Sequence, residues 1–296
     1  MFDKSINKPH EMFGLFEKIF NSLFIFVFMI VYDNHFHMDS NGKGVEAVKE
    51  FEKSGGTAMM VVSKPYIEIK RGEDFMREYE ILLSLVRDAK EKTGVKIFTA
   101  LGVHPSRISD FKSLDKAKKI MVEGIELAAR CVGDGKANAI GEVGRPHYET
   151  SPEVWDASNE VMEYAMMRAK DVGCAVIIHS ESSDKTYEEI SQIAGKVGIK
   201  KGRVIKHFSP IVKSTFGLTP SVIATFENAK NAFEKMDSFL LESDYIDDPK
   251  RPGAVIGPKT LPKTVKRLIE NSVTSEKNIN FAMKELPEKI YGINLD

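Results

Sequence analysis

Histidines and carboxylates stand at the ends of short apolar, β-prone runs in this sequence. Five of the seven histidines and two acidic residues are placed in this way: His35, His37, His104, Glu142, His179, His207 and Asp244. A parallel β-barrel collects the side chains at the C-terminal ends of its strands at one rim, where enzymes of this architecture keep their chemistry. Neutral imidazoles and carboxylates gathered there are typical ligands of divalent metals. The pattern therefore predicts a metal centre at the rim of a barrel.

The first two histidines and the glutamate have the spacing that a metal site needs. His35 and His37 are two residues apart on a predicted strand, so both imidazoles share one face. By itself, the pair is equally compatible with one packed and one exposed ring. Glu142 follows an apolar strand, where a carboxylate is costly to bury unless an ion or a base compensates it. A salt bridge to Arg145 is the structural alternative.

Three further residues strengthen the metal prediction. His179 and His207 each end a separate predicted strand, in nearly identical positions. Asp244 ends the eighth strand, which returns beside the first strand in a closed barrel and so brings this carboxylate next to His35 and His37. A metal-bound water needs such a neighbour to take its proton. The alternative for Asp244 is a helix cap or a loop position.

Short apolar runs alternate with helical stretches over most of the chain, which is typical of a parallel sheet built from βα units. We predict a (β/α)8 TIM-type barrel, irregular around strands 6 and 7 because the connection from 208 to 220 is short. The predicted strands are 30–35, 57–63, 96–103, 138–143, 174–179, 203–208, 220–225 and 238–243. The predicted helices are 44–54, 73–92, 115–132, 152–172, 184–197 and 226–236, with covering helices at 260–271 and 276–287.

Composition narrows the class of protein. The 42 basic residues nearly balance the 43 acidic ones, which argues against a globally basic nucleic-acid binder. The two cysteines, Cys131 and Cys174, are too few for a disulfide framework and favour a reducing cytoplasm. The sequence does not indicate an oligomeric state.

The first 28 residues share no pattern with the rest, and we expect the barrel to occupy 29–296. The uninterrupted apolar run from 23 to 32 has ten residues, whereas a membrane span needs about 20. We therefore expect no stable membrane insertion. Translation starting at Met29 is the favoured explanation of the extension, and an amphipathic helix on the barrel or on a membrane surface is the alternative.

Six ordered motifs together resemble those of the TatD-related metal-dependent hydrolases, within the amidohydrolase-like barrel superfamily. The resemblance runs from about residue 29 to the C-terminus. The motifs are His35-x-His37, Gly-Val-His104-Pro, Gly141-Glu142-Val-Gly144, Ile-Ile-His179-Ser, Ile-Lys-His207-Phe-Ser and Leu-Leu-Glu-Ser-Asp244. They are specific for the superfamily and less specific for the substrate.

This resemblance implies a centre with two divalent ions, which are Zn, Mn or Mg. His35 and His37 would hold the first ion, Glu142 would bridge, and His179 and His207 would hold the second. Asp244 would bind the first ion and handle the proton of the attacking water. His104 would contact the substrate or its leaving group. The four histidine ligands favour zinc or manganese over magnesium.

The motif around Glu142 departs from the family pattern. The usual Gly-Leu-Asp is replaced by Gly144-Arg145-Pro146-His147. Arg145 could bind a phosphate oxygen or pair with Glu149 or another acid. Lys64, Arg107 and Arg145 follow strands 2, 3 and 4, and we predict that they bind substrate. Ordinary solvated charge is the alternative for each.

The resemblance and the ligand set favour a divalent-metal phosphodiesterase that acts on small molecules or on nucleic-acid ends, in the manner of a TatD-like nuclease. An amide, lactone or non-phosphate ester hydrolase on the same barrel is the alternative. Many hydrolases of that kind bridge their metals with a modified lysine where this chain has Glu142. A non-catalytic metal protein is disfavoured because the candidate ligands are too many for a closed structural site.

Overall fold

The computed structural model describes residues 29–251 and 254–296. Eight parallel strands form one sheet in the order β1 to β8, as predicted. The strands are β1 (Tyr32–Phe36), β2 (Ala58–Val62), β3 (Lys96–Leu101), β4 (Ala139–Gly144), β5 (Ala175–His179), β6 (Val204–Ser209), β7 (Thr219–Ile223) and β8 (Leu240–Glu242). The predictions for 1–28 lie outside the described residues, so the proposed boundary at residue 29 stays a prediction.

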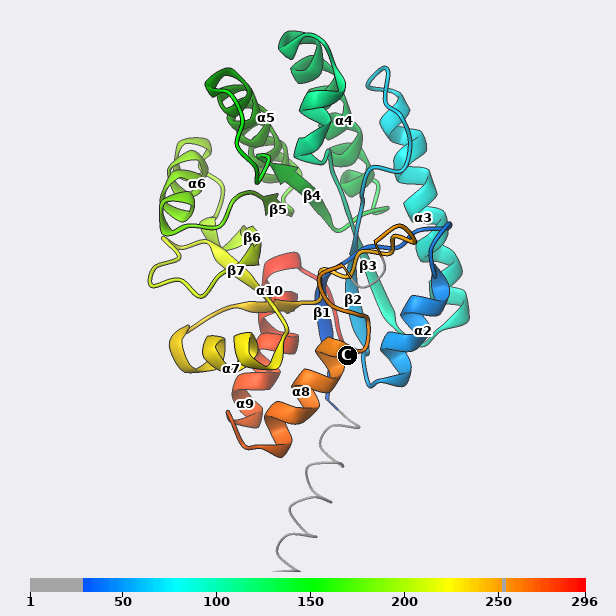
Figure 1. Ribbon diagram of the computed structural model, residues 1–296, viewed down its shortest axis with the longest axis vertical. Helices are drawn as coiled ribbons and strands as arrows, with labels where there is room; N and C mark the ends of the chain where they lie inside the picture. The colour runs from blue at the N-terminus through cyan, green and yellow to red at the C-terminus, as the bar shows by residue number, and fades with distance from the viewer. Residues whose placement is uncertain (1–28, 252–253) are drawn as a thin grey trace, which may run out of the picture.

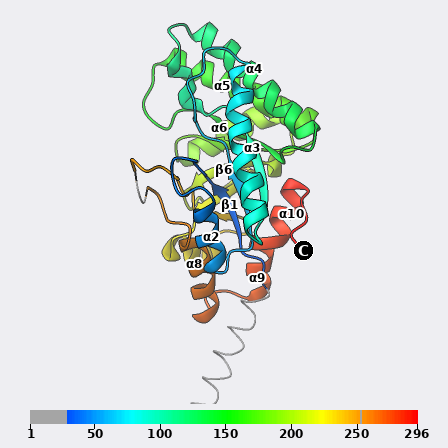
Figure 2. The same ribbon diagram turned by 90° about the vertical axis from the view of Figure 1, so that its right-hand side faces the viewer.

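Helices surround the strands and form the outer layer of a (β/α)8 barrel (Figures 1 and 2). They are α2 (Val45–Lys53), α3 (Asp74–Lys92), α4 (Leu114–Gly133), α5 (Pro152–Asp171), α6 (Asp184–Val197), α7 (Phe226–Lys235), α8 (Thr260–Glu270) and α9 (Glu276–Asn280). A further helix, α10 (Leu286–Tyr291), packs against the barrel interior instead. Residues 210–218, between β6 and β7, contain no helix, which is the predicted irregularity. Among the described residues, no helix is long and apolar enough to span a membrane.

Local sequence signals explain where the clearest helix begins and ends. Ser151 Oγ accepts a hydrogen bond from the Val154 amide, and Pro152 occupies the first turn of α5. The Ser151 side chain satisfies one of the free amides at the helix start, and Pro152 has no amide N–H to satisfy. Gly173 follows with a φ of 73°, a left-handed conformation that glycine adopts without steric cost.

The barrel closes between its first and last strands. Phe36 and Tyr245 form a parallel bridge, and the His37 amide donates to the Tyr245 carbonyl over 2.9 Å. Deeper in the barrel, the Asp33 carboxylate accepts hydrogen bonds from the amides of His35 and Ser243. These contacts bring the end of β8 beside the end of β1, which is the arrangement that the Asp244 prediction requires.

The apolar side chains form two cores. The larger one lies between the strands and the surrounding helices. The smaller one fills the barrel interior with residues such as Met60, Ile177 and Ile205, and α10 contributes Leu286 and Ile290 to it. Side chains alternate between these cores along each strand, so a strand residue next to an inward-facing one is buried under the helices.

Candidate metal centre

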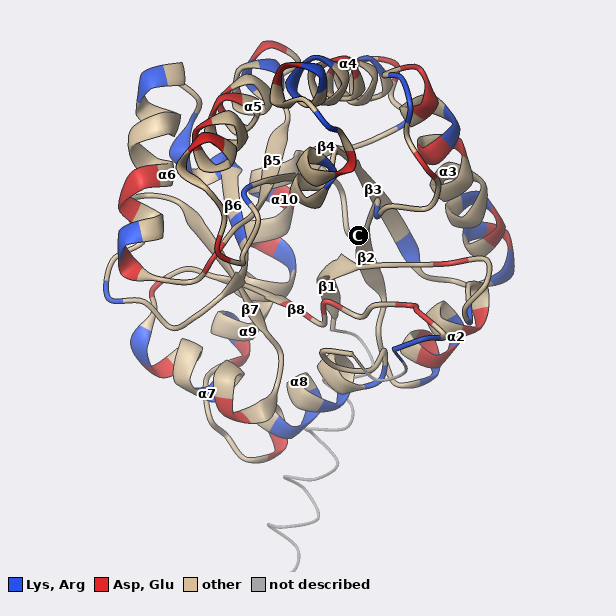
Figure 3. Ribbon diagram, turned by 45° about the horizontal axis from the view of Figure 1, so that its top comes forward, with Lys and Arg blue, Asp and Glu red and all other residues tan. Residues whose placement is uncertain are grey.

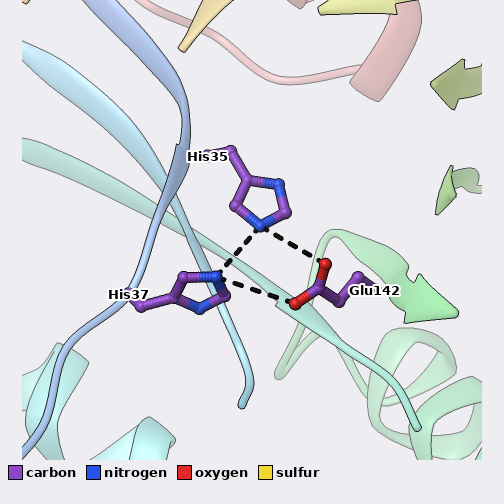
Figure 4. A group of neighbouring side chains, drawn as sticks. All are labelled: His35, His37 and Glu142. Atoms are coloured by element: carbon purple, nitrogen blue, oxygen red, sulfur yellow. Dashed lines mark hydrogen bonds and ion pairs between the residues drawn. The ribbon is translucent and has the colours of Figure 1, made fainter. Parts of the chain in front are cut away.

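Glu142 lies at the middle of the predicted ligands. His35 Nε2 lies 3.8 Å from Glu142 Oε2, and His37 Nε2 lies 3.7 Å from Glu142 Oε1 (Figure 4). On the other side, His179 Nδ1 and His207 Nε2 each lie 3.0 Å from Glu142 Oε2. One carboxylate therefore contacts two separate pairs of imidazoles, which come from strands β1, β5 and β6.

Asp244 completes the group on the side of β1. Its Oδ1 lies 3.6 Å from His37 Nε2 and 3.9 Å from His35 Nε2. His35, His207 and Asp244 form one of three clusters whose donor atoms lie close enough to share a metal ion, and the other two contain Glu142. The structure thus brings together the six residues that the sequence predicts as ligands.

Acceptors face the outer nitrogens of two of the rings. His37 Nδ1 lies 2.9 Å from the Val62 carbonyl, within hydrogen-bond distance, and His207 Nδ1 faces a carboxylate oxygen of Glu242 in an ion-pair contact of 3.4 Å. An acceptor at Nδ1 favours a proton there, so in the neutral ring the lone pair is on Nε2, which points at Glu142. Such outer partners commonly set the orientation and basicity of metal-binding histidines.

Two pairs of histidine nitrogens lie close enough together to bind a cation between them. His35 Nε2 and His37 Nε2 lie 3.2 Å apart, and His179 Nδ1 and His207 Nε2 lie 3.0 Å apart. Two lone pairs at this distance repel unless a proton or a cation lies near both. The set of nitrogen and carboxylate donors suits zinc or manganese better than magnesium, and the residues present therefore fit a divalent-metal site.

His104 differs from the other histidines. Its Nδ1 accepts a hydrogen bond from the Ser106 amide at 3.2 Å, so in the neutral ring the proton is on Nε2. That nitrogen lies 3.7 Å from Glu142 Oε1. Burial lowers the pKa of His104 to about 3, although Glu142 opposes the shift. A neutral ring with an inward N–H can donate to a substrate oxygen.

The charges of the cluster are strongly coupled. Burial alone would lower the pKa of His207, but hydrogen bonding and charge from Glu142 and Glu242 outweigh it and raise this pKa to about 10. Burial would raise the pKa of Glu142, yet the surrounding histidines hold it well below its usual range. Glu142 is therefore ionised, as a metal ligand must be.

Two residues of the site were not predicted from the sequence. Glu242 is completely buried, and its carboxylate contacts His207, the Phe208 amide and the Ser221 hydroxyl. The sequence could have indicated Glu242, because it lies two residues after Leu240 and so shares the face of β8 that points into the barrel. The second is His147, an exposed residue whose Nδ1 lies 2.8 Å from His179 Nε2.

The three predicted substrate-binding cations already have acidic partners. Lys64 Nζ lies 2.7 Å from Asp39 Oδ2, and the Arg107 guanidinium pairs with Glu78. Their role in binding substrate stays a prediction, and it requires that these groups exchange or share their partners.

Arg145 is held most firmly of the three. Its side chain is 1% exposed and pairs with Glu181 and with Glu189, the latter at 2.8 Å. Its guanidinium also lies 4.0 Å from the centre of the Trp155 ring. The sequence left open whether Arg145 pairs with Glu149 or with another acid. In the structure its partners are other acids, Glu181 and Glu189.

A cavity of about 390 Å³ opens beside the cluster. His179, His207 and Asp244 line it, so a molecule in the cavity reaches the candidate metal ligands directly. The cavity lies at the C-terminal ends of the strands, where barrel enzymes bind substrate.

The sequence pattern of the TatD related DNases matches residues 32–292. The chain belongs to this family. The uncharacterized protein MJ1127 of Methanocaldococcus jannaschii is 39% identical over 276 residues, which are 90% of this chain and 97% of that protein.

Solved structures agree with the fold. The TatD homologue YJJV of Escherichia coli superposes with a TM-score of 0.64 at 17% identity and covers 91% of this chain and 99% of its own. The phosphotriesterase homology protein of Escherichia coli, solved with phosphate in its active site, has a TM-score of 0.60 at 15% identity and covers 89% and 99%. The family, the fold and the donor clusters identify a metal-dependent hydrolase.

Proposed function

We propose that this protein is a phosphodiesterase that binds two divalent metal ions. The observation that carries the proposal is the position of Glu142, whose carboxylate contacts His35 and His37 on one side and His179 and His207 on the other. A carboxylate between two groups of imidazoles has the geometry of a bridging ligand.

These contacts support the ligand assignment that the family resemblance implies. His35, His37 and Asp244 would hold one ion, His179 and His207 would hold the other, and Glu142 would bind both. Zinc or manganese suits these donors best, with magnesium as the third possibility. When bound, such a pair of ions lowers the pKa of water toward ~7 and stabilises charge on the attacking and leaving oxygens.

The protein side chains would supply the proton transfers and orientation. Asp244 lies in the cavity within 3.9 Å of both β1 histidines and would accept the proton of the attacking water. His104 would donate its Nε2 proton as a hydrogen bond to a substrate or leaving-group oxygen. Glu242 would position His207 through its outer nitrogen.

The choice of phosphodiesters rests on the relatives. The family is described as TatD related DNases, and one structural neighbour contains phosphate in its active site. Nucleic-acid ends are accordingly one substrate class to test.

The buried, unpaired Cys131 and Cys174 support a location in the reducing cytoplasm.

The test is hydrolysis of bis(p-nitrophenyl) phosphate by protein that has been treated with a chelator and then given zinc, manganese or magnesium separately. We expect at least one ion to restore turnover, and Glu142→Gln to abolish it. Glu149→Gln, at an exposed position of the loop that follows β4, is the matched control and should stay active. Metal binding without turnover of any phosphodiester would refute the proposal and favour an amide, lactone or other ester as substrate.

A further inference from the structure

One wall of the cavity beside the metal cluster is apolar. Phe208, Ile246 and Val255 line it next to His207 and Asp244. Phe208 is 44% exposed and Val255 is 36% exposed, which places both among the few large apolar side chains on the described surface. Exposed apolar groups beside a reactive centre are typical of a ligand-binding surface.

The backbone is built to present Phe208 to the cavity. The register between β6 and β7 shifts between Lys206 and Ser209, and such bulges redirect side chains. Phe208 has a φ of 50°. Its amide donates to Glu242 Oε1 over 2.6 Å, and its carbonyl accepts from Ser182 Oγ over 3.1 Å. Two hydrogen bonds therefore hold a conformation that phenylalanine rarely adopts.

Unfavourable backbone conformations are concentrated at this cavity. Five non-glycine residues of the described chain have positive φ, and three of them line it: Phe208, Asp244 and Val255. Conformations of this kind cost free energy and persist mainly at functional sites. Asp244 is a candidate metal ligand. The strained backbone of Phe208 and Val255 indicates that these two apolar residues have a functional role as well.

The charges around the cavity do not suit a polyanion. Among the described residues that line it, none is a lysine or arginine, and Glu181 adds an acid. The nearby Lys64, Arg107 and Arg145 are paired with carboxylates. In Figure 3, Lys and Arg are found mainly on the outer helices of the barrel. A nucleic-acid strand would need several phosphate contacts.

We propose that Phe208, Ile246 and Val255 bind an uncharged aromatic substituent of a small phosphoester that carries a single phosphoryl group. The proposal rests on the phosphodiesterase function proposed above and narrows its substrate class. The phosphoryl group would lie at the metal cluster, and the aromatic ring would pack against the Phe208 ring, where offset or edge contacts are favourable.

A binding experiment tests this separately from catalysis. In mildly alkaline buffer, phenylphosphonate and methylphosphonate are both dianions, and neither can be hydrolysed as an ester. Calorimetry on the metal-loaded protein then compares a phenyl ring with a methyl group at equal charge. We expect phenylphosphonate to bind roughly tenfold more tightly, and Phe208→Asn to remove most of this preference. Asparagine tolerates positive φ, so the variant should keep the backbone.

Phe216→Asn is the matched control, because Phe216 has a φ of 48°, is 41% exposed and does not line the cavity. It should retain the preference for phenylphosphonate. Val255→Asn provides a second test in case Phe208→Asn fails to fold, and it should also reduce the preference. Equal affinity for the two phosphonates, or a preference that survives in both cavity variants, would overturn the proposal.

A comparison with an oligonucleotide substrate distinguishes the proposed phosphodiesterase function from the proposed aromatic substrate. We expect the kcat/KM for bis(p-nitrophenyl) phosphate to exceed that for a short single-stranded oligodeoxynucleotide and to change little between about 50 and about 200 mM salt. A faster oligonucleotide reaction with steep salt dependence would overturn the proposal while supporting phosphodiesterase function. A phenylphosphonate preference without turnover of any phosphodiester would support the apolar wall and refute the proposed function.

Discussion

Replacing Glu142 with glutamine should strip the protein of metal while leaving its fold intact. Glutamine has nearly the same shape, but it removes the negative charge that contacts four histidines. For one unit charge of each sign 3.0 Å apart, the distance from Glu142 to His207, Coulomb's law with an effective dielectric constant of about 20 gives roughly 5 to 6 kcal/mol. Interaction with a divalent ion is at least of this order.

Part of that energy is recovered in the variant, because water and the amide oxygen replace the carboxylate. Taking about half as the net loss gives roughly 2.7 kcal/mol, or a hundredfold weaker binding. The assay is metal content after dialysis, by elemental analysis, together with calorimetric titration of the metal. Glu149→Gln is the control for the loss of one exposed charge.

The result that refutes the reasoning is an unchanged metal content and affinity in a folded Glu142→Gln protein. Circular dichroism and thermal unfolding of the chelator-treated proteins provide the check on folding. In that case Glu142 would not bridge, and its contacts with the histidines would be ion pairs of a metal-free site. If Glu142→Gln lost both metal and the folded state, Glu142→Asp would separate the two causes, because aspartate keeps the charge and only shortens the side chain.

Three further predictions follow from neighbouring contacts. Asp244→Asn should retain bound metal but lower kcat by roughly 10²- to 10⁴-fold, the usual contribution of a proton-transfer group, and normal steady-state turnover would remove Asp244 from that role. Glu242→Gln should weaken metal binding by roughly 10- to 100-fold by releasing His207, as measured by calorimetry, and unchanged affinity would contradict the positioning role. Arg145→Met should destabilise the protein by about 3 kcal/mol in urea unfolding, because it removes the buried cation from the partly buried carboxylates of Glu181 and Glu189, of which, among the described residues, only Glu189 keeps another ion pair, with Lys185. A raised KM with unchanged stability would instead support the role of Arg145 in substrate binding.

Much of the site could be predicted because strand ends are a local property of the chain. An apolar, β-branched run such as Val176-Ile177-Ile178 predicts both the strand and the point where it ends, and His179 stands at that point. In a parallel barrel, all such points meet at one rim. Because side chains alternate along a strand, Lys206 lies on the opposite face of β6 from His207, and its ammonium donates to the carbonyls of Ser180 and His207.

The partners of the remaining residues depended on distances across the fold. Arg145 follows a strand end like the candidate metal ligands, but it pairs with Glu181 and Glu189, which lie 36 and 44 residues further along the chain. The role of Glu242 became visible only when β6 and β8 brought it beside His207 and Phe208. Likewise, Phe208 lines the cavity at a shift in the register between β6 and β7, which the local sequence does not reveal.

The sequence by itself therefore determined the barrel, the order of its strands and the residues that end them, because these follow from short-range patterns of apolar and polar residues. Tertiary structure decided which charges are already paired, which carboxylate faces which imidazole, and which apolar side chains line the cavity beside the histidines. Those outcomes depend on contacts between strands and loops whose distances no local pattern specifies.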